Sequence, residues 1–232
     1  YMFIYDEPAG SKYRDLAIAG YKHAKDVKPE VPIAVTTTLE FAETMNDYFN
    51  INMFSYYADD FDPAIARTLC RDSKDLYWAY GQSWSNLPHS CATLRYEAGF
   101  YAWKQGFEGI GWWAYRVSVK DPQNDLDGST QDFMMSYQSE QGVQSTLNWE
   151  AIREGIDDLK YLNTLEYWIS CAKSNNLLDV NVQEATNLLS TIRAAVTVTR
   201  PYVISPNTLK GILTSEQMQD YRNQISFSIV KL

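Results

Sequence analysis

The sequence predicts an α/β fold, in which helices cover a sheet of parallel strands, followed by an all-helical C-terminal segment. Five short apolar segments alternate with amphipathic segments over the first half of the 232 residues, as β-α-β units do. Hydrophobic residues make up 45% of the chain, which allows a large core. Beyond residue 148, apolar residues recur at helical spacing.

The five predicted strands are short, apolar and rich in aromatic residues, as buried strands are. They lie at residues 1–5, 31–35, 51–57, 76–81 and 109–115. The helices between them are predicted at residues 13–27, 39–48, 62–71 and 88–105. Asp62 and Pro63 supply an N-cap and a proline at the first helical position. Gly106 is expected to end the last of these helices.

The C-terminal part is predicted to be helical after a polar, irregular segment at 121–146, which holds one short strand near 134–137. Helices are expected at 148–173, at 182–199 after Asn181, and from a capping-box pattern at 214–217. The apolar stripe of the first helix would be Ile152, Ile156, Leu159, Leu162, Leu165, Ile169 and Ala172. We therefore expect a β/α body at 1–147 and helices packed on it at 148–232.

The residues alone leave two sheet architectures open. Five strands could form an open doubly wound sheet or the second half of an eight-stranded barrel. A dinucleotide-binding sheet is not favoured, because no G-x-G-x-x-G follows a strand. The chain begins inside a predicted strand, so we expect it to be the C-terminal part of a longer protein.

Composition argues against several classes of protein. The formal net charge is −9 and no basic stripe is present, which argues against nucleic-acid binding. No apolar run reaches the length of about 18 residues that a membrane-spanning helix needs. Cys70, Cys91 and Cys171 lack metal-binding spacing and favour buried thiols, with one disulfide left open. We expect neither a metal ion nor a cofactor.

The candidate catalytic pair is Asp6 and Glu7, at the end of the first predicted strand. Active sites of parallel β/α folds lie at the carboxyl ends of strands. Two carboxylates there could supply a general acid and an electrostatic stabiliser. Pro8 favours an extended conformation for Glu7. The alternative is an exposed acidic turn without function.

Aromatic residues near the strand ends form a candidate sugar-binding set. Sugar rings stack on flat aromatic faces, and strand alternation would place Trp113 towards such a site and Trp112 under helices. The set comprises Tyr57, Trp78, Tyr80, Trp113 and Tyr115. Packing of these rings in the core is the alternative.

Four motifs follow one another along the chain: YDEP, LYWAYG, LRYEAGFYAWKQGFEGIGWW and WEAIREGIDDLKYL. In this order they resemble the catalytic domain of glycoside hydrolase family 123, over about residues 1–165. The resemblance implies the C-terminal portion of a (β/α)8 TIM-type barrel, from its fourth strand onward, completed by an N-terminal half-barrel. It also implies retaining hydrolysis of terminal N-acetyl-β-galactosaminides, in which the substrate's own acetamido oxygen is the nucleophile.

The resemblance also implies roles for individual residues. Asp6 would orient the acetamido group, Glu7 would be the general acid/base, and the aromatic residues would line the pocket. Arg95 falls where the family often has an arginine, but Asn148 stands where the family commonly has one. The expected partner is a glycan substrate, and the expected location is secreted, periplasmic or on the cell surface. A catalytically silent barrel, serving as a carbohydrate-binding or structural glycan-surface module, is the alternative.

Overall fold

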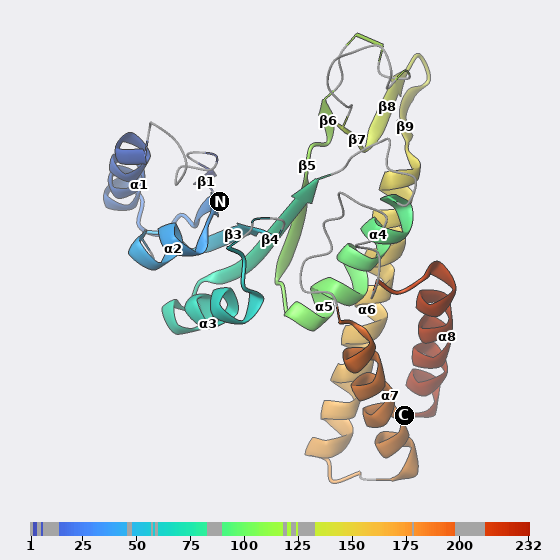
Figure 1. The fold of residues 1–232 in the computed structure, drawn as a ribbon. Coiled ribbons are helices and arrows are strands. Elements are labelled where there is room, and N and C mark those ends of the chain that lie inside the picture. Colours follow the sequence, from blue (N-terminus) through green and yellow to red (C-terminus); the bar gives the residue numbers. More distant parts are fainter. Residues whose placement is uncertain are drawn as a thin grey trace. The chain divides into compact units, whose positions relative to one another are not determined.

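The computed structural model describes two compact units of this chain (Figure 1). The described residues are 2–3, 6, 14–45, 48–56, 58, 60–82, 90–117, 120–121, 124, 133–177, 179–197 and 212–232. The first unit comprises Tyr1–Gly81 and Gln105–Trp113, and the second comprises Gln82–Lys104 and Ala114–Leu232. The predicted division between residues 147 and 148 stays a prediction.

A five-stranded sheet forms the centre of the first unit, with its strands in the order β1-β2-β3-β4-β5. The strands are β1 (Met2–Phe3), β2 (Ile33–Thr37), β3 (Ile51–Ser55), β4 (Leu76–Gln82) and β5 (Gly109–Trp113). The pairings of β1 with β2, β2 with β3 and β3 with β4 are parallel. The predicted α/β class with a parallel sheet is therefore confirmed.

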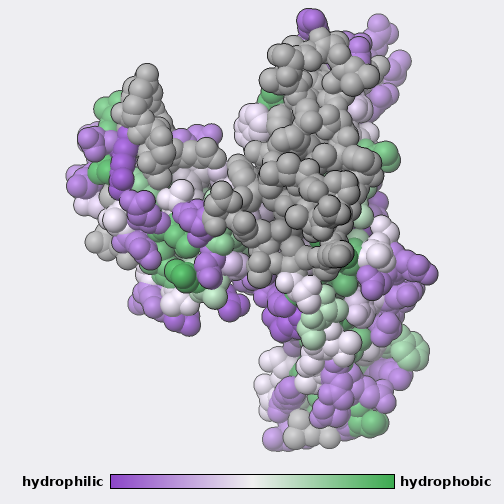
Figure 2. Space-filling model, viewed as in Figure 1, coloured by the Kyte–Doolittle hydropathy of each residue, from purple (hydrophilic) through white to green (hydrophobic). Residues whose placement is uncertain are grey.

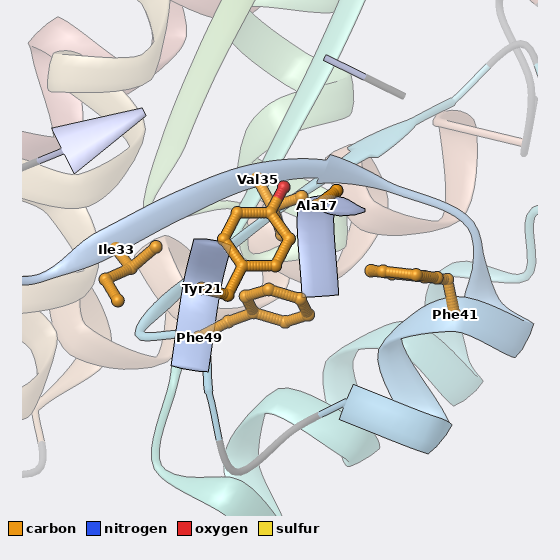
Figure 3. Close-up of a cluster of buried hydrophobic side chains, with 6 residues drawn as sticks. All are labelled: Ala17, Tyr21, Ile33, Val35, Phe41 and Phe49. Carbon is orange, nitrogen blue, oxygen red and sulfur yellow. The ribbon is translucent and has the colours of Figure 1, made fainter. Parts of the chain in front are cut away.

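Two helices cover one face of β2. They are α1 (Arg14–Val27) and α2 (Leu39–Met45). Figure 3 shows the buried cluster that they share with the sheet, formed by Ala17, Tyr21, Ile33, Val35, Phe41 and Phe49. The ring of Tyr21 meets that of Phe49 edge-on, with centroids 4.9 Å apart. Ala17 and Tyr21 are buried on the side of α1 that faces the sheet, whereas Val27 at the end of the helix is exposed.

Helix α3 (Pro63–Ser73) begins as the sequence predicts. The carboxylate of Asp62 accepts hydrogen bonds from the backbone N–H groups of Ala64 and Ile65, at 2.8 and 3.1 Å. The hydroxyl of Tyr77 on β4 donates to the carbonyl of Pro63 at 3.3 Å. Helix α3 therefore lies on the Tyr77 side of the sheet.

Three long helices and a shorter pair form most of the second unit. They are α4 (Ser90–Tyr96), α5 (Ala102–Gln105), α6 (Leu147–Ser174), α7 (Val180–Ala195) and α8 (Ser215–Lys231). A π-helical turn at Glu97–Tyr101 joins α4 to α5, where a single regular helix was predicted. This turn packs closely against α6, because a methyl group on Gly99 would lie 2.8 Å from the carbonyl oxygen of Gly155.

The buried face of helix α6 overlaps the predicted apolar stripe, of which Ile152, Leu162, Leu165 and Ile169 are buried. Its buried residues are Asn148, Ala151, Ile152, Gly155, Asp158, Leu162, Leu165 and Ile169, whereas Ile156 is exposed. Gly155 lets α4 approach closely, and ion pairs permit the burial of Asp158. The start of α7 also differs, because Asp179 rather than Asn181 is the N-cap and accepts from the Val182 N–H. The capping box of Thr214 and Gln217 on α8 is confirmed.

The polar segment before α6 contains more strands than predicted. Strand β6 (Arg116–Val117) pairs antiparallel with β7 (Phe133–Met134), and β8 (Ser136–Ser139) forms a hairpin with β9 (Gly142–Ser145). Gly142 has a φ of 114°, which suits a tight turn between strands.

The helices carry both polar and apolar surface. Figure 2 shows hydrophilic and hydrophobic side chains interspersed over the visible faces. Among the described residues, no helix combines the length and hydrophobicity needed to cross a lipid bilayer.

Candidate active site

Most of the candidate residues that the structure describes lie on the face of the sheet that points away from α1 and α2. Ile33 and Val35 belong to the core under α1 and α2, so Thr36 points to the other side of β2. Strand register then places Met53 beside Thr36 and Trp78 beside Met53. We call this side the Trp78 face, and its residues on β2 to β4 include Thr36, Met53, Ser55, Trp78 and Tyr80.

Asp6 lies beyond the carboxyl end of β1 and is held by the neighbouring strand. The hydroxyl of Thr36 donates a hydrogen bond to Oδ1 of Asp6 at 2.8 Å. Thr36 is buried, with 6% of its surface exposed, whereas Asp6 is exposed. The carboxylate therefore presents to solvent from a fixed point at the strand end, as a group that meets a substrate must.

The phenol of Tyr21 lies within electrostatic range of this carboxylate. Burial raises the pKa of Tyr21 above its ordinary value, and the negative charge of Asp6 raises it further. Tyr21 is therefore neutral at physiological pH, so it adds no negative charge beside Asp6.

Trp78 occupies its position because β5 has no side chain there. A methyl group on Gly109 would lie 2.5 Å from the indole of Trp78, so the ring crosses β5 directly over this glycine. By alternation, Gly111 and Trp113 share the side of β5 that carries Trp78. Trp112 points the other way and is half-buried.

The aromatic side chains differ in the surface that they offer to a sugar. Trp113 is 45% exposed and Trp78 is half-buried, whereas only 7% of Tyr80 is exposed. The two tryptophans therefore have more area for stacking on a sugar ring than Tyr80 has. That Asp6 and these rings line one cleft stays a prediction, as does the packing of Trp112 under helices.

Three of the predicted site residues are not part of this arrangement as described. Glu7 and Tyr57 lie outside the described residues. Tyr115 belongs to the second unit, where its exposed ring meets that of Trp149 edge-on at 6.2 Å. Its predicted role in the pocket stays a prediction.

Arg95 has a partner inside the second unit. Its Nε and Nη2 donate to the two carboxylate oxygens of Asp158, at 2.7 and 3.2 Å. Arg222 of α8 donates to Asp158 at 2.5 Å and to Glu154 at 2.6 Å. Hydrogen bonding from Arg222 lowers the pKa of Glu154. This cluster joins α4, α6 and α8, so the structure gives Arg95 a bracing position.

The remaining candidate groups are consistent with simple packing roles. All three cysteines are free thiols, and burial, followed by the charge of Asp75, raises the pKa of Cys70 to about 12. Asn148 is buried on α6. In the described part of the chain, no group of three or more His, Cys, Asp or Glu side chains could hold a metal ion.

The sequence interpretation missed Thr36. Its only signal was the run Thr36-Thr37-Thr38 at the end of a predicted strand, where hydroxyl groups can reach a site at the sheet edge. Nothing in the sequence alone distinguished the threonine that faces Asp6 from its neighbours.

Comparison with known families agrees with the motifs. A family model described as glycoside hydrolase 123, catalytic domain, matches residues 1–165. No curated protein matches the chain. The matched region contains the complete five-stranded sheet, Asp6, the tryptophans of the Trp78 face and most of α6. The chain therefore belongs to the glycoside hydrolase 123 family, whose members are hydrolases that act on glycans.

Proposed function

We propose that the protein is a retaining exo-N-acetyl-β-hexosaminidase that acts on N-acetylgalactosaminides by substrate-assisted catalysis. The observation that carries the proposal is the exposed Asp6 carboxylate at the carboxyl end of β1, oriented by Thr36 in a chain of this family. The exposed Trp113 and half-buried Trp78 on the same sheet support a sugar-binding role for the Trp78 face.

In the proposed mechanism, the substrate supplies its own nucleophile. Glu7 donates a proton to the glycosidic oxygen while the acetamido carbonyl oxygen attacks the anomeric carbon, so the bond to the leaving group breaks. Asp6 accepts a hydrogen bond from the acetamido N–H and balances the positive charge of the oxazolinium intermediate. Glu7 then removes a proton from water, which attacks the anomeric carbon and restores the acetamido group with retained configuration.

We further propose that the sheet is part of a (β/α)8 barrel. Its strands follow the order of the chain, β1-β2-β3-β4-β5, without the reversal that characterises a doubly wound sheet. The end-of-strand position of Asp6 also suits a barrel, whose active sites lie at that end. A closed barrel of this type needs eight strands, so an additional half-barrel would complete the site.

The roles of the two carboxylates can be separated by the leaving group. In the full-length protein, Glu7→Gln should lower kcat/KM by roughly 10²–10⁴-fold on an alkyl N-acetyl-β-galactosaminide, because the leaving oxygen loses its proton donor. The loss should be much smaller on the 4-nitrophenyl substrate, whose leaving group needs little protonation. Asp6→Asn should lower kcat/KM similarly on both, because oxazolinium formation does not depend on the leaving group.

Matched controls are available on exposed carboxylates of the same unit. Asp60→Asn and Glu43→Gln remove one negative charge each from exposed positions, and both variants should keep wild-type kinetics. Activity near the wild-type value in both Asp6→Asn and Glu7→Gln would contradict the assignment. An equal loss on both substrates in Glu7→Gln would contradict its role as proton donor.

A further inference from the structure

The hydrogen bond between Thr36 and Asp6 joins a buried donor to an exposed acceptor. The Thr36 hydroxyl donates to Oδ1 of Asp6 at 2.8 Å. Among the described residues, no hydrogen bond reaches Oδ2 of the same carboxylate. Within the described part of the chain, the protein therefore binds one of the two carboxylate oxygens of Asp6.

The donor is held firmly. Thr36 lies within β2, where its backbone is in register with Met53 of β3. Its side chain is β-branched, which restricts rotation about the Cα–Cβ bond. A hydroxyl fixed in this way favours one orientation of a carboxylate that would otherwise rotate freely in solvent.

A second residue near Asp6, from α1, adds no competing charge. Tyr21 is within electrostatic range of Asp6 and, as shown above, remains neutral because burial raises its pKa. No negative charge on Tyr21 therefore competes with the hydrogen bond that Thr36 donates to Asp6. A hydrogen bond from a neutral donor to an ionised acceptor is stronger than one between two neutral groups.

We propose that Thr36 is a positioning residue, which holds Oδ1 of Asp6 so that Oδ2 accepts the hydrogen bond from the substrate's acetamido N–H. This inference rests on the proposed substrate-assisted function, because only that mechanism requires Asp6 to orient an N–H group. A merely structural bond that closes β1 against β2 would affect stability and leave turnover unchanged.

The test compares two adjacent buried threonines of β2. Thr37 is 5% exposed, points to the opposite side of the strand and donates its hydroxyl to the carbonyl of Thr38 at 3.0 Å. In the full-length protein, Thr36→Val should lower kcat on 4-nitrophenyl N-acetyl-β-galactosaminide by about 10- to 100-fold, since a hydrogen bond to a charged group is lost. KM should change much less. Thr36→Ser should restore most of kcat, and Thr37→Val should keep wild-type kcat.

A double-mutant cycle with Asp6→Asn shows whether Thr36 acts through Asp6. If it does, Thr36→Val should cause little further loss of kcat in the Asp6→Asn background. Additive losses, or a Thr36→Val variant with wild-type kcat, would overturn the inference while leaving the proposed function intact. If Thr36→Val does not fold, the same double-mutant cycle is measured with Thr36→Ala. A wild-type enzyme inactive on the N-acetyl substrate would overturn the proposed function and this inference with it.

Discussion

Two glycines of the sheet show how small residues leave space for large ones. Gly109 leaves the space that the Trp78 indole occupies, and Gly81 on β4 similarly accommodates the ring of Tyr56. Neither glycine has the positive φ that only glycine adopts easily. Both are therefore required for space rather than for backbone conformation.

Adding one methyl group at Gly109 should disturb this arrangement. The new Cβ of Gly109→Ala would lie 2.5 Å from the indole, so Trp78 must move, and overpacking should cost about 1–3 kcal/mol of unfolding free energy. Urea unfolding followed by tryptophan fluorescence measures the loss.

Gly111 is the matched control, two residues further along β5 on the same side. A Cβ there would have no atom within 4 Å. Gly111→Ala should therefore leave stability unchanged or raise it by up to about 1 kcal/mol, through a smaller unfolded-state entropy. Equal losses in the two variants would show that Trp78 does not depend on the space over Gly109.

At the scale of the elements, helix α6 packs closely against its neighbours through a glycine and a buried carboxylate. Gly155 brings its backbone against α4, where a methyl group would lie 2.4 Å from the Arg95 carbonyl oxygen. One turn later, Asp158 is buried with 1% exposure and is hydrogen-bonded by Arg95 of α4 and Arg222 of α8. The helix is thus fixed to two neighbours by one carboxylate.

Replacing this carboxylate should destabilise the helical unit strongly. Asp158→Asn removes the partner of two largely buried guanidinium groups, which should cost about 3–5 kcal/mol. The adjacent Asp157 pairs with Lys160 and Arg153 at the surface, so Asp157→Asn should cost less than about 1 kcal/mol. Unfolding in urea, followed by far-ultraviolet circular dichroism, compares them. Similar losses would contradict the bracing role of Asp158.

Regular elements with local signals could be predicted from the sequence, and those that depend on distant partners could not. The Asp62 cap and the Thr214 capping box are encoded within four residues, and both are confirmed. The buried face of α6 was predicted only in part, because Asp158 appears polar until Arg95 and Arg222 are placed beside it. Of the β8–β9 hairpin, only a strand near 134–137 was predicted, because β9 is short and exposed along its whole length.

Part of the candidate site could be predicted from the sequence, because the ends of the strands could be predicted. The end-of-strand rule selected Asp6, and alternation selected the tryptophans that lie on the same sheet. Thr36 required the structure, because three consecutive threonines differ only in the direction in which each points. The position of Glu7 stays a prediction.

At the scale of the whole molecule, the consecutive order of the strands and the family membership support one account. In the proposed account, the sheet supplies carboxylates and aromatic rings from one end, and the substrate supplies the nucleophile. The substituent at C2 of the sugar is then part of the catalytic machinery. Because an intramolecular nucleophile is worth several orders of magnitude in rate, its removal should nearly abolish turnover.

The most direct test is the hydrolysis of two 4-nitrophenyl β-galactosides by the full-length wild-type protein, one with a 2-acetamido group and one with a 2-hydroxyl group. The account predicts a kcat/KM at least about 1,000-fold higher for the 2-acetamido substrate. Binding of N-acetylgalactosamine without hydrolysis would instead favour the silent carbohydrate-binding barrel. Comparable hydrolysis of the two substrates would contradict substrate-assisted catalysis.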